Sequence, residues 1–407
     1  MRVILHEDHA TPTVGVVTWF RVGSKDEMVG KTGFAHLFEH LMFKGSTHVP
    51  DGLMDRLLEE AGGWSNAFTS SDMTVYQDLA AANFLETALW IAADRLAGHT
   101  DTLDQPKLDN QREVVRNERR QSYENRPYGM AELLIQEALW PKNHGYHWST
   151  IGYHEDLVAA DLADVRSFFA SYYVPNNATL VIAGDIDPKK ARALVEKYLG
   201  WLPRAAEPKR PSYPPPAPIT AEVKLVTTDE VQVPRVYLSW RGPAGYHAEE
   251  PALDLAAAVL GGGKSSRLYK RLVFADRIAQ DVSAHFAGEE LAGTFQIEAT
   301  AKPGIDPQRL IAVITEEVAR LAAAAPEPAE LERAQNSREA SFLSNLESVL
   351  ARGIQIAAYD VLAGDPDYLG KDLLRYRAVK PGEVAVAAKK WLAPSSRVVL
   401  TINPETK

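Results

Sequence analysis

The sequence contains no cysteine, no long apolar run and no basic surface segment. Without cysteine the chain can form no disulfide bond, and any metal ligands must be nitrogen or oxygen atoms. No stretch approaches the roughly eighteen consecutive apolar residues of a transmembrane helix, so we expect no membrane span. The formal net charge is -10 without a continuous basic face, which argues against nucleic-acid binding.

The length and composition are those of a globular protein with more than one domain. A chain of 407 residues with 45% hydrophobic content predicts two to three domains. Residues 1–6 have the pattern of a β-strand rather than of a signal peptide. We therefore expect a cytoplasmic location, or a periplasmic one if a leader has been removed.

Two histidines and a glutamate interrupt an apolar helical pattern in residues 33–43. His36 and His40 are one helical turn apart, so both imidazole rings can approach one metal ion. Glu39 lies next to the helix face that the two histidines share, where a carboxylate can reach a metal-activated water without serving as a ligand. The order His-x-x-Glu-His is the inverse of the commoner zincin motif. Two such histidines can also be solvated or belong to a core, so the motif alone does not establish a metal site.

A catalytic zinc site needs a third protein ligand and an open fourth position. The candidate is Glu118, which lies in a long charged helical pattern and is separated from His40 by seventy-seven residues. Glu113, in the same predicted helix, is the alternative.

With these residues the chain resembles the inverzincin metallopeptidases related to pitrilysin, insulin-degrading enzyme and mitochondrial processing peptidase. That family closes its site with a glutamate at about this distance, in a helix of the type Arg-x-x-Val-x-x-x-Glu. The resemblance implies that one Zn²⁺ ion is bound by His36, His40 and Glu118. It also implies that Glu39 is the general base, and it favours Glu118 over Glu113.

A second position on the same predicted helix departs from the family. Many members have a glutamate where this chain has Gln111, and that glutamate lies next to the metal ligands without binding the metal itself. A neutral amide can still donate or accept a hydrogen bond there. The resemblance therefore assigns Gln111 a supporting place next to the ligands.

A glycine pair at residues 62–63 precedes two short strand patterns in residues 64–76. This segment is similar to the family's Gly-Gly-x-x-Asn-Ala-x-Thr strand, which lies beside the zinc and accepts substrate as an added strand. Backbone pairing at a sheet edge holds extended peptides of many sequences, while side-chain pockets set preference. The resemblance implies substrate contacts by Asn66, Ala67 and Phe68. From the pattern alone, an ordinary hairpin edge is the alternative.

The second half of the chain repeats the first. Seven of the sixteen residues 203–218 are proline, which predicts an extended linker. A helix, proline turn and strand at residues 164–181 recur 219 residues later, at 383–400. The same offset moves the metal residues onto four that cannot bind zinc, namely Leu255, Ala258, Val259 and Ser337.

These patterns predict an α+β fold with two similar domains. Each is expected to be a mixed, mostly antiparallel sheet with helices packed on it, as in the family. We expect a catalytic zinc domain at 1–203, a proline-rich linker at 204–218 and a duplicated domain without a metal site at 219–407.

A glycine-rich segment at residues 261–266 invites interpretation as a phosphate-binding loop. That interpretation fails because Ala258 stands where the motif requires glycine and because the preceding residues have a helical pattern. The segment is instead similar to a mobile Gly-Gly-Gly-x-Ser-Ser-Arg-Leu loop of the family that faces the substrate. The resemblance implies that Gly261, Gly262 and Gly263 belong to such a loop in this chain.

One departure from the family lies just after this loop. Catalytically complete members carry an arginine and a tyrosine seven residues apart, which bind substrate and stabilise the transition state. This chain has Val273 and Gln280 at those positions, and neither can replace a cationic or phenolic donor aimed at an oxyanion. The resemblance therefore implies a heterodimer in which a homologous subunit without zinc supplies the pair; a homodimer is the less favoured alternative.

The sequence as a whole predicts a zinc-dependent endopeptidase that hydrolyses extended oligopeptides or unfolded segments. Two alternatives remain open at this stage. One is a catalytically silent scaffold subunit, as occurs among relatives in respiratory complexes. The other is a peptidase that processes targeting sequences.

Overall fold

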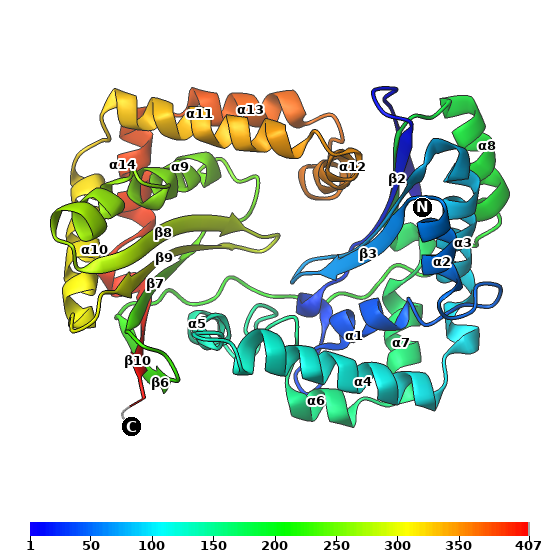
Figure 1. The fold of residues 1–407 in the computed structure, drawn as a ribbon, viewed down its shortest axis with the longest axis horizontal. Coiled ribbons are helices and arrows are strands. Elements are labelled where there is room, and N and C mark those ends of the chain that lie inside the picture. Colours follow the sequence, from blue (N-terminus) through cyan, green and yellow to red (C-terminus); the bar gives the residue numbers. More distant parts are fainter. Residues whose placement is uncertain (406–407) are drawn as a thin grey trace. The chain divides into compact units, whose positions relative to one another are not determined.

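The computed structural model describes residues 1–405, which form two compact units that each contain one five-stranded sheet (Figure 1). Both sheets are mixed and mostly antiparallel, and helices pack on them. The predicted α+β fold class is confirmed. Within the described residues, no helix is both long enough and apolar enough to cross a bilayer.

The first sheet has the strand order β1-β5-β2-β4-β3. Only β1 and β5 pair in parallel; the other neighbours are antiparallel. β3 is an edge strand. The strands are β1 (Arg2–Glu7), β2 (Thr13–Phe20), β3 (Trp64–Thr69), β4 (Thr74–Ala81) and β5 (Ala178–Gly184).

Both faces of this sheet are covered, which explains why β5 is buried along its whole length. On one face Leu89 of α3 packs with Val14, Val16 and Ile182, and on the other Leu350 of α12 packs with the next residue in β2, Val17. The helices of the first unit are α1 (Phe34–Leu41), α2 (Leu53–Glu60), α3 (Leu85–Thr102), α4 (Gln105–Arg119), α6 (His154–Ala159), α7 (Leu162–Tyr172), α8 (Pro188–Leu199) and α12 (Val349–Ala358).

The second sheet repeats this topology strand for strand. Its order is β6-β10-β7-β9-β8, again with one parallel pair, β6 with β10. The predicted repeat is therefore present in the fold. The strands are β6 (Val223–Asp229), β7 (Arg235–Gly242), β8 (Ala279–Gly288), β9 (Gly293–Ala301) and β10 (Arg397–Pro404).

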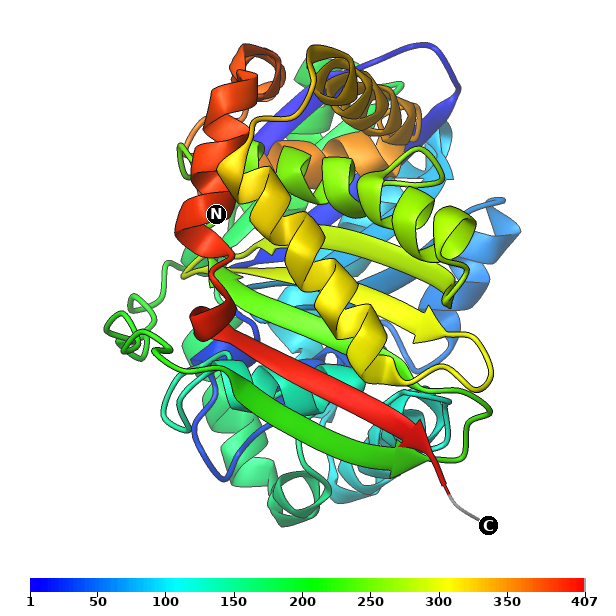
Figure 2. The same cartoon turned by 90° about the vertical axis from the view of Figure 1, so that its left-hand side faces the viewer.

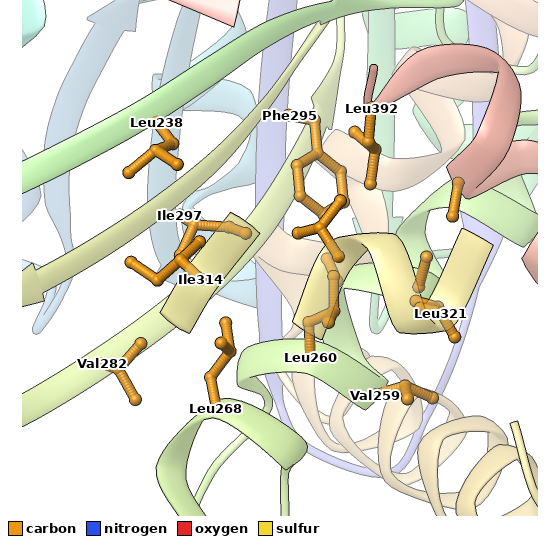
Figure 3. Packing of buried hydrophobic residues seen from close by; sticks show 14 of the residues in the cluster. Leu238, Val259, Leu260, Leu268, Val282, Phe295, Ile297, Ile314, Leu321 and Leu392 are labelled. Atoms are coloured by element: carbon orange, nitrogen blue, oxygen red, sulfur yellow. The ribbon is translucent and has the colours of Figure 1, made fainter. Parts of the chain in front are cut away.

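Helices cover one face of the second sheet with a large apolar core. Figure 3 shows Phe295 and Ile297 of β9 facing Ile314 of α10 and Leu260 of α9. In Figure 2, α10 and α14 lie across the near face of this sheet. The helices of the second unit are α5 (Ala131–Leu139), α9 (Glu250–Gly261), α10 (Pro307–Ala323), α11 (Pro328–Asn345), α13 (Leu369–Ala378) and α14 (Pro381–Trp391).

The compact units are not continuous in sequence, unlike the predicted domains 1–203 and 219–407. The first contains Met1–Arg119, Trp148–Tyr213 and Leu343–Tyr368, and the second contains the rest of the described chain. The reason is that each sheet has an apolar face that is covered by a helix from the other half of the sequence. α12 packs on the first sheet through Leu350 and Ala357, and α5 packs on the second through Ile135 and Leu139.

The proline-rich segment has no regular structure, as expected, but it is bound to the first unit as far as Tyr213. Arg210 donates hydrogen bonds to Asp26 at 2.9 Å and to Asn177 at 2.6 Å. The hydroxyl of Tyr213 donates to the carbonyl of Lys25 at 2.6 Å. The segment up to Tyr213 therefore packs on the first unit and is not a free linker.

Candidate metal centre

The helix that carries the histidines, α1, is short and mostly buried. Phe34, Leu37, Phe38 and Leu41 form its apolar side, and the ring of Phe38 stacks on that of Phe168 with centroids 5.1 Å apart. The histidines therefore occupy the less buried side of the helix. Their spacing of one turn gives them a common direction.

The third candidate ligand lies at the end of α4, which packs against α1. The buried residues of α4 are Leu108, Gln111, Val115 and Arg119, a spacing of three or four that defines one face of a helix. Glu118 lies beside this face and is half-buried. The α1–α4 contact thus brings a carboxylate from a distant part of the sequence to the two imidazoles.

Three ligand-type atoms meet at this contact. His36 Nε2 and His40 Nε2 are 3.2 Å apart, and Glu118 Oε2 lies 3.7 Å and 3.4 Å from them, respectively. Within residues 1–405, no other group of three or more histidine and carboxylate side chains converges in this way. Two imidazole nitrogens and one carboxylate oxygen form the donor set of many catalytic zinc sites, so the residues present fit a zinc ion.

The alternative ligand Glu113 is not part of this group. Its carboxylate is paired with Arg116, one turn further along α4. Arg116 also donates to His154 Nδ1 at 3.4 Å. Glu113 therefore belongs to an ion-pair network on α4.

Burial keeps the histidine side of the site ready to bind a cation. Burial lowers the pKa of His36 to about 4, with the nearby His40 as the second cause. The imidazole of His36 is therefore neutral at physiological pH. A hydrogen bond from His40 is the main reason that the pKa of Glu118 lies below its ordinary value, so this carboxylate is ionised.

Glu39 lies next to the ligands but has a separate partner. Its side chain is nearly buried, with 8% of the residue exposed, and its Oε2 accepts a 2.6 Å hydrogen bond from the hydroxyl of Thr69. Burial raises the pKa of Glu39, and the bond from Thr69 opposes this shift. The sequence analysis did not identify Thr69, although this residue is the final threonine of the Asn-Ala-x-Thr pattern.

Thr69 ends β3, so the predicted substrate strand is tied to the predicted base. Hydrogen bonds alternate along an antiparallel pair, and the bond from Ser70 N to Met73 O sets the register. Asn66 and Phe68 therefore pair with β4, and the N–H of Ala67 points to the open edge. The Asn66 side-chain oxygen accepts a hydrogen bond from this N–H at 2.8 Å.

The remaining predicted site residues lie outside the metal cluster. Gln111 is buried, and its amide donates to Asn110 Oδ1 at 2.7 Å. Gly261 is the last residue of α9 in the second unit, and Gly262 and Gly263 come directly after it. A Cβ atom on Gly261 would lie 2.3 Å from the backbone nitrogen of Ala284, and Gly263 has a φ of 82°, so local packing and backbone geometry account for two of them.

Comparison with known proteins identifies the family. Residues 2–147 match the model described as Insulinase (Peptidase family M16), and residues 159–338 match the Peptidase M16 inactive domain. The zinc protease PqqE of Helicobacter pylori (strain ATCC 700392 / 26695) is 31% identical over 343 residues, which cover 84% of this chain and 77% of that protein. The chain belongs to peptidase family M16.

Solved structures agree with this assignment. This M16 chain superposes on the crystal structure of a protease from Helicobacter pylori with a TM-score of 0.92, at 28% identity, over 99% of this chain and 97% of that one. The periplasmic protease PqqL of Escherichia coli is similar in fold, with a TM-score of 0.79 and 18% identity. The match covers 98% of this chain but only 46% of PqqL, so the present chain corresponds in fold to about half of that protein.

Proposed function

We propose that this M16 protein is a zinc-dependent endopeptidase that hydrolyses extended oligopeptides or unfolded segments. The observation that carries the proposal is the convergence of His36, His40 and Glu118 with a buried carboxylate, Glu39, beside them. The M16 relative PqqE, which is named a zinc protease, supports the same activity.

His36, His40 and Glu118 would hold the zinc ion, which when bound supplies the Lewis acidity that activates water for attack on a carbonyl carbon. Glu39 accepts a proton from the attacking water as the new C–O bond forms. It then delivers that proton to the leaving nitrogen as the C–N bond breaks. The raised pKa of Glu39 suits both steps, because a group that takes up and releases a proton works best near the operating pH.

The open edge of β3 supports an extended substrate. An added strand would bond to the outward-facing backbone groups of β3, and Thr69 at the end of that strand contacts the proposed base. Asn66 caps the outward N–H of Ala67, so an incoming strand would displace this amide. Such pairing depends on the substrate backbone and therefore accepts many sequences. A folded protein presents few free strands and is expected to be a poor substrate.

In this proposal a partner subunit completes the active site of the zinc-binding chain. Val273 is half-buried against the core of the second unit, and Gln280 is exposed where the pairing of β8 is irregular. Neither side chain offers a cation or a phenol for the transition state. In our proposal a homologous subunit without zinc supplies the arginine and tyrosine. The length of PqqL, about twice that matched by this chain, supports an active unit built from two such halves.

The test of the activity is zinc content combined with cleavage of a mixed quenched peptide library. Glu39→Gln is expected to bind zinc like the wild type but to lose turnover, because the amide cannot accept the proton. Glu113→Gln is the matched control, since Glu113 is a carboxylate of the neighbouring helix that pairs with Arg116. A Glu39→Gln protein with normal turnover would overturn the assignment of the base.

The test of the partner uses the same library. The purified chain is measured alone and after mixing with homologous chains of similar length that lack the zinc motif. Activity that appears only on mixing supports the two-subunit site. Ordinary turnover by the chain alone, shown to be free of other subunits, would contradict it and leave a homodimer as the active form.

A further inference from the structure

The metal helix α1 starts without a side-chain cap of its own. The residue before its first turn is Gly33, which has a φ of 83° and no side chain to accept a hydrogen bond. The first N–H groups of a helix have no partner within the helix and need an acceptor. His36, one of the proposed ligands, lies in this first turn.

A buried carboxylate from a preceding turn provides the missing acceptor. Glu27 Oε2 accepts from the N–H of Gly33 at 2.9 Å, and Glu27 Oε1 accepts from the N–H of Ala35 at 2.7 Å. Only 3% of Glu27 is exposed. Burial raises the pKa of Glu27 well above its ordinary value, and the hydrogen bonds from these two N–H groups oppose the shift.

Glu27 is held in place by a segment that follows the metal helices in sequence. The indole nitrogen of Trp148 donates to Glu27 Oε2 at 3.1 Å and to the carbonyl of Ser24 at 2.9 Å. A few residues later the same segment lies against the start of α1. A Cβ atom on Gly33 would be 2.9 Å from the carbonyl oxygen of Ile151, so only glycine permits this contact.

The same segment is bonded to the helix of the third ligand. Arg119, the residue directly after Glu118, is buried and donates from Nη1 to the carbonyl oxygen of Gly152. Gly152 in turn packs against Gly33: a Cβ atom on Gly152 would be 2.5 Å from the Gly33 Cα atom. A continuous set of contacts therefore links the end of α4 to the start of α1.

We infer that Glu27 is a positioning residue of the metal site. It fixes the first turn of α1 against residues 148–152, and this segment also holds the end of α4, so that His36 and His40 stay opposite Glu118. The inference rests on the proposed zinc site, but it concerns the geometry of the helices and can be measured without zinc.

The experiment compares Glu27→Gln with Asp360→Asn. Glutamine has the shape of glutamate, but its NH₂ group cannot accept from one of the two backbone donors. Asp360 is another buried carboxylate of the first unit, bonded to Thr179 and Arg2. We measure zinc affinity by competition with a chromophoric chelator, hydrogen exchange of the α1 amides in the metal-free protein, and thermal unfolding.

We expect Glu27→Gln to weaken zinc binding by about tenfold to a hundredfold, the usual effect of losing a group that orients a ligand. We also expect faster exchange of the α1 amides. Asp360→Asn should leave both quantities unchanged even if it lowers the melting temperature. Trp148→Phe, which removes the donor to Glu27 and Ser24 and leaves a smaller aromatic ring, should change them in the same direction by less.

Wild-type zinc affinity in Glu27→Gln, or an equal loss in Asp360→Asn, would overturn the inference. If the wild-type chain itself binds no zinc, the proposed function fails. The exchange measurement then still decides the inference: faster α1 exchange in Glu27→Gln alone supports Glu27 as a positioning residue, and unchanged exchange refutes it.

Discussion

The hydrogen bond from Thr69 to Glu39 predicts a shift in the pH dependence of catalysis. Thr69→Val keeps the β-branched shape but removes the hydroxyl that donates to Glu39 Oε2 at 2.6 Å. Burial already raises the pKa of Glu39, and the bond from Thr69 lowers it. Without this bond the pKa of Glu39 therefore rises further.

The size of the shift follows from the strength of the bond. A hydrogen bond to a charged group contributes about 1.5 to 3 kcal/mol. One pKa unit corresponds to about 1.4 kcal/mol, so losing a bond of this strength is enough to raise the pKa of Glu39 measurably. Because Glu39 is only 8% exposed, water can do little to replace the lost donor.

The assay is the pH dependence of kcat/KM with a quenched peptide. A general base must be ionised, so its pKa in the free enzyme appears as the acid limb of the profile. A higher pKa moves this limb toward higher pH in Thr69→Val. Thr69→Ser keeps a hydroxyl and should leave the limb near its wild-type position. If the valine variant loses rate but keeps the wild-type acid limb, Thr69 does not act through Glu39 and the reasoning is wrong.

Two further predictions concern stability. His99 contacts the Gly45 carbonyl, and burial lowers the pKa of His99 from 6.5 to about 4. The free energy of unfolding should therefore fall as the pH drops below 6.5, because the unfolded chain takes up the proton first. The total loss should reach about 3 kcal/mol once the pH is below 4. Urea unfolding of metal-free His99→Gln at several pH values should show a smaller loss; an equal loss would contradict this origin. Leu350→Ala, at a buried residue of α12, should cost about 2 to 5 kcal/mol in equilibrium unfolding. Leu374→Ala, at a residue that is 62% exposed, should cost about 0.5 kcal/mol or less, and equal costs would refute the packing argument.

The local features of the fold could be predicted from the sequence because they depend on short-range geometry. The spacing of His36 and His40 determines a common helix face whatever surrounds it. The strand predicted at the end of the first repeat corresponds to β5. The proline turn that recurs at the 219-residue offset precedes the equivalent strand in each sheet. Glu118 was favoured over Glu113 only through the family resemblance, since both lie on the same helix.

The exchange of helices between the two units could not be predicted in this way. An amphipathic pattern indicates that one face of a helix is buried, but it does not indicate which sheet buries it. The sequence pattern of α12 does not identify the first sheet as the surface that buries its apolar residues. The cap of α1 was missed for a related reason. Glu27 lies six residues before Gly33, whereas sequence rules for caps consider only the residues next to the first turn.

The repeat also explains why, within residues 1–405, the candidate metal site lies in the first unit alone. In each unit the first helix after the second strand is equivalent by topology, α1 in the first and α9 in the second. In α1 the histidines face the end of α4, and the opposite side of the helix is buried. In α9 the positions that the offset equates with His36 and His40 are Leu255 and Val259, which are both buried in the apolar core of the second unit. Figure 3 shows Val259 in this core. Placing ligands there would bury polar groups without partners and remove apolar contacts, so the second unit gains a continuous core where the first has a site.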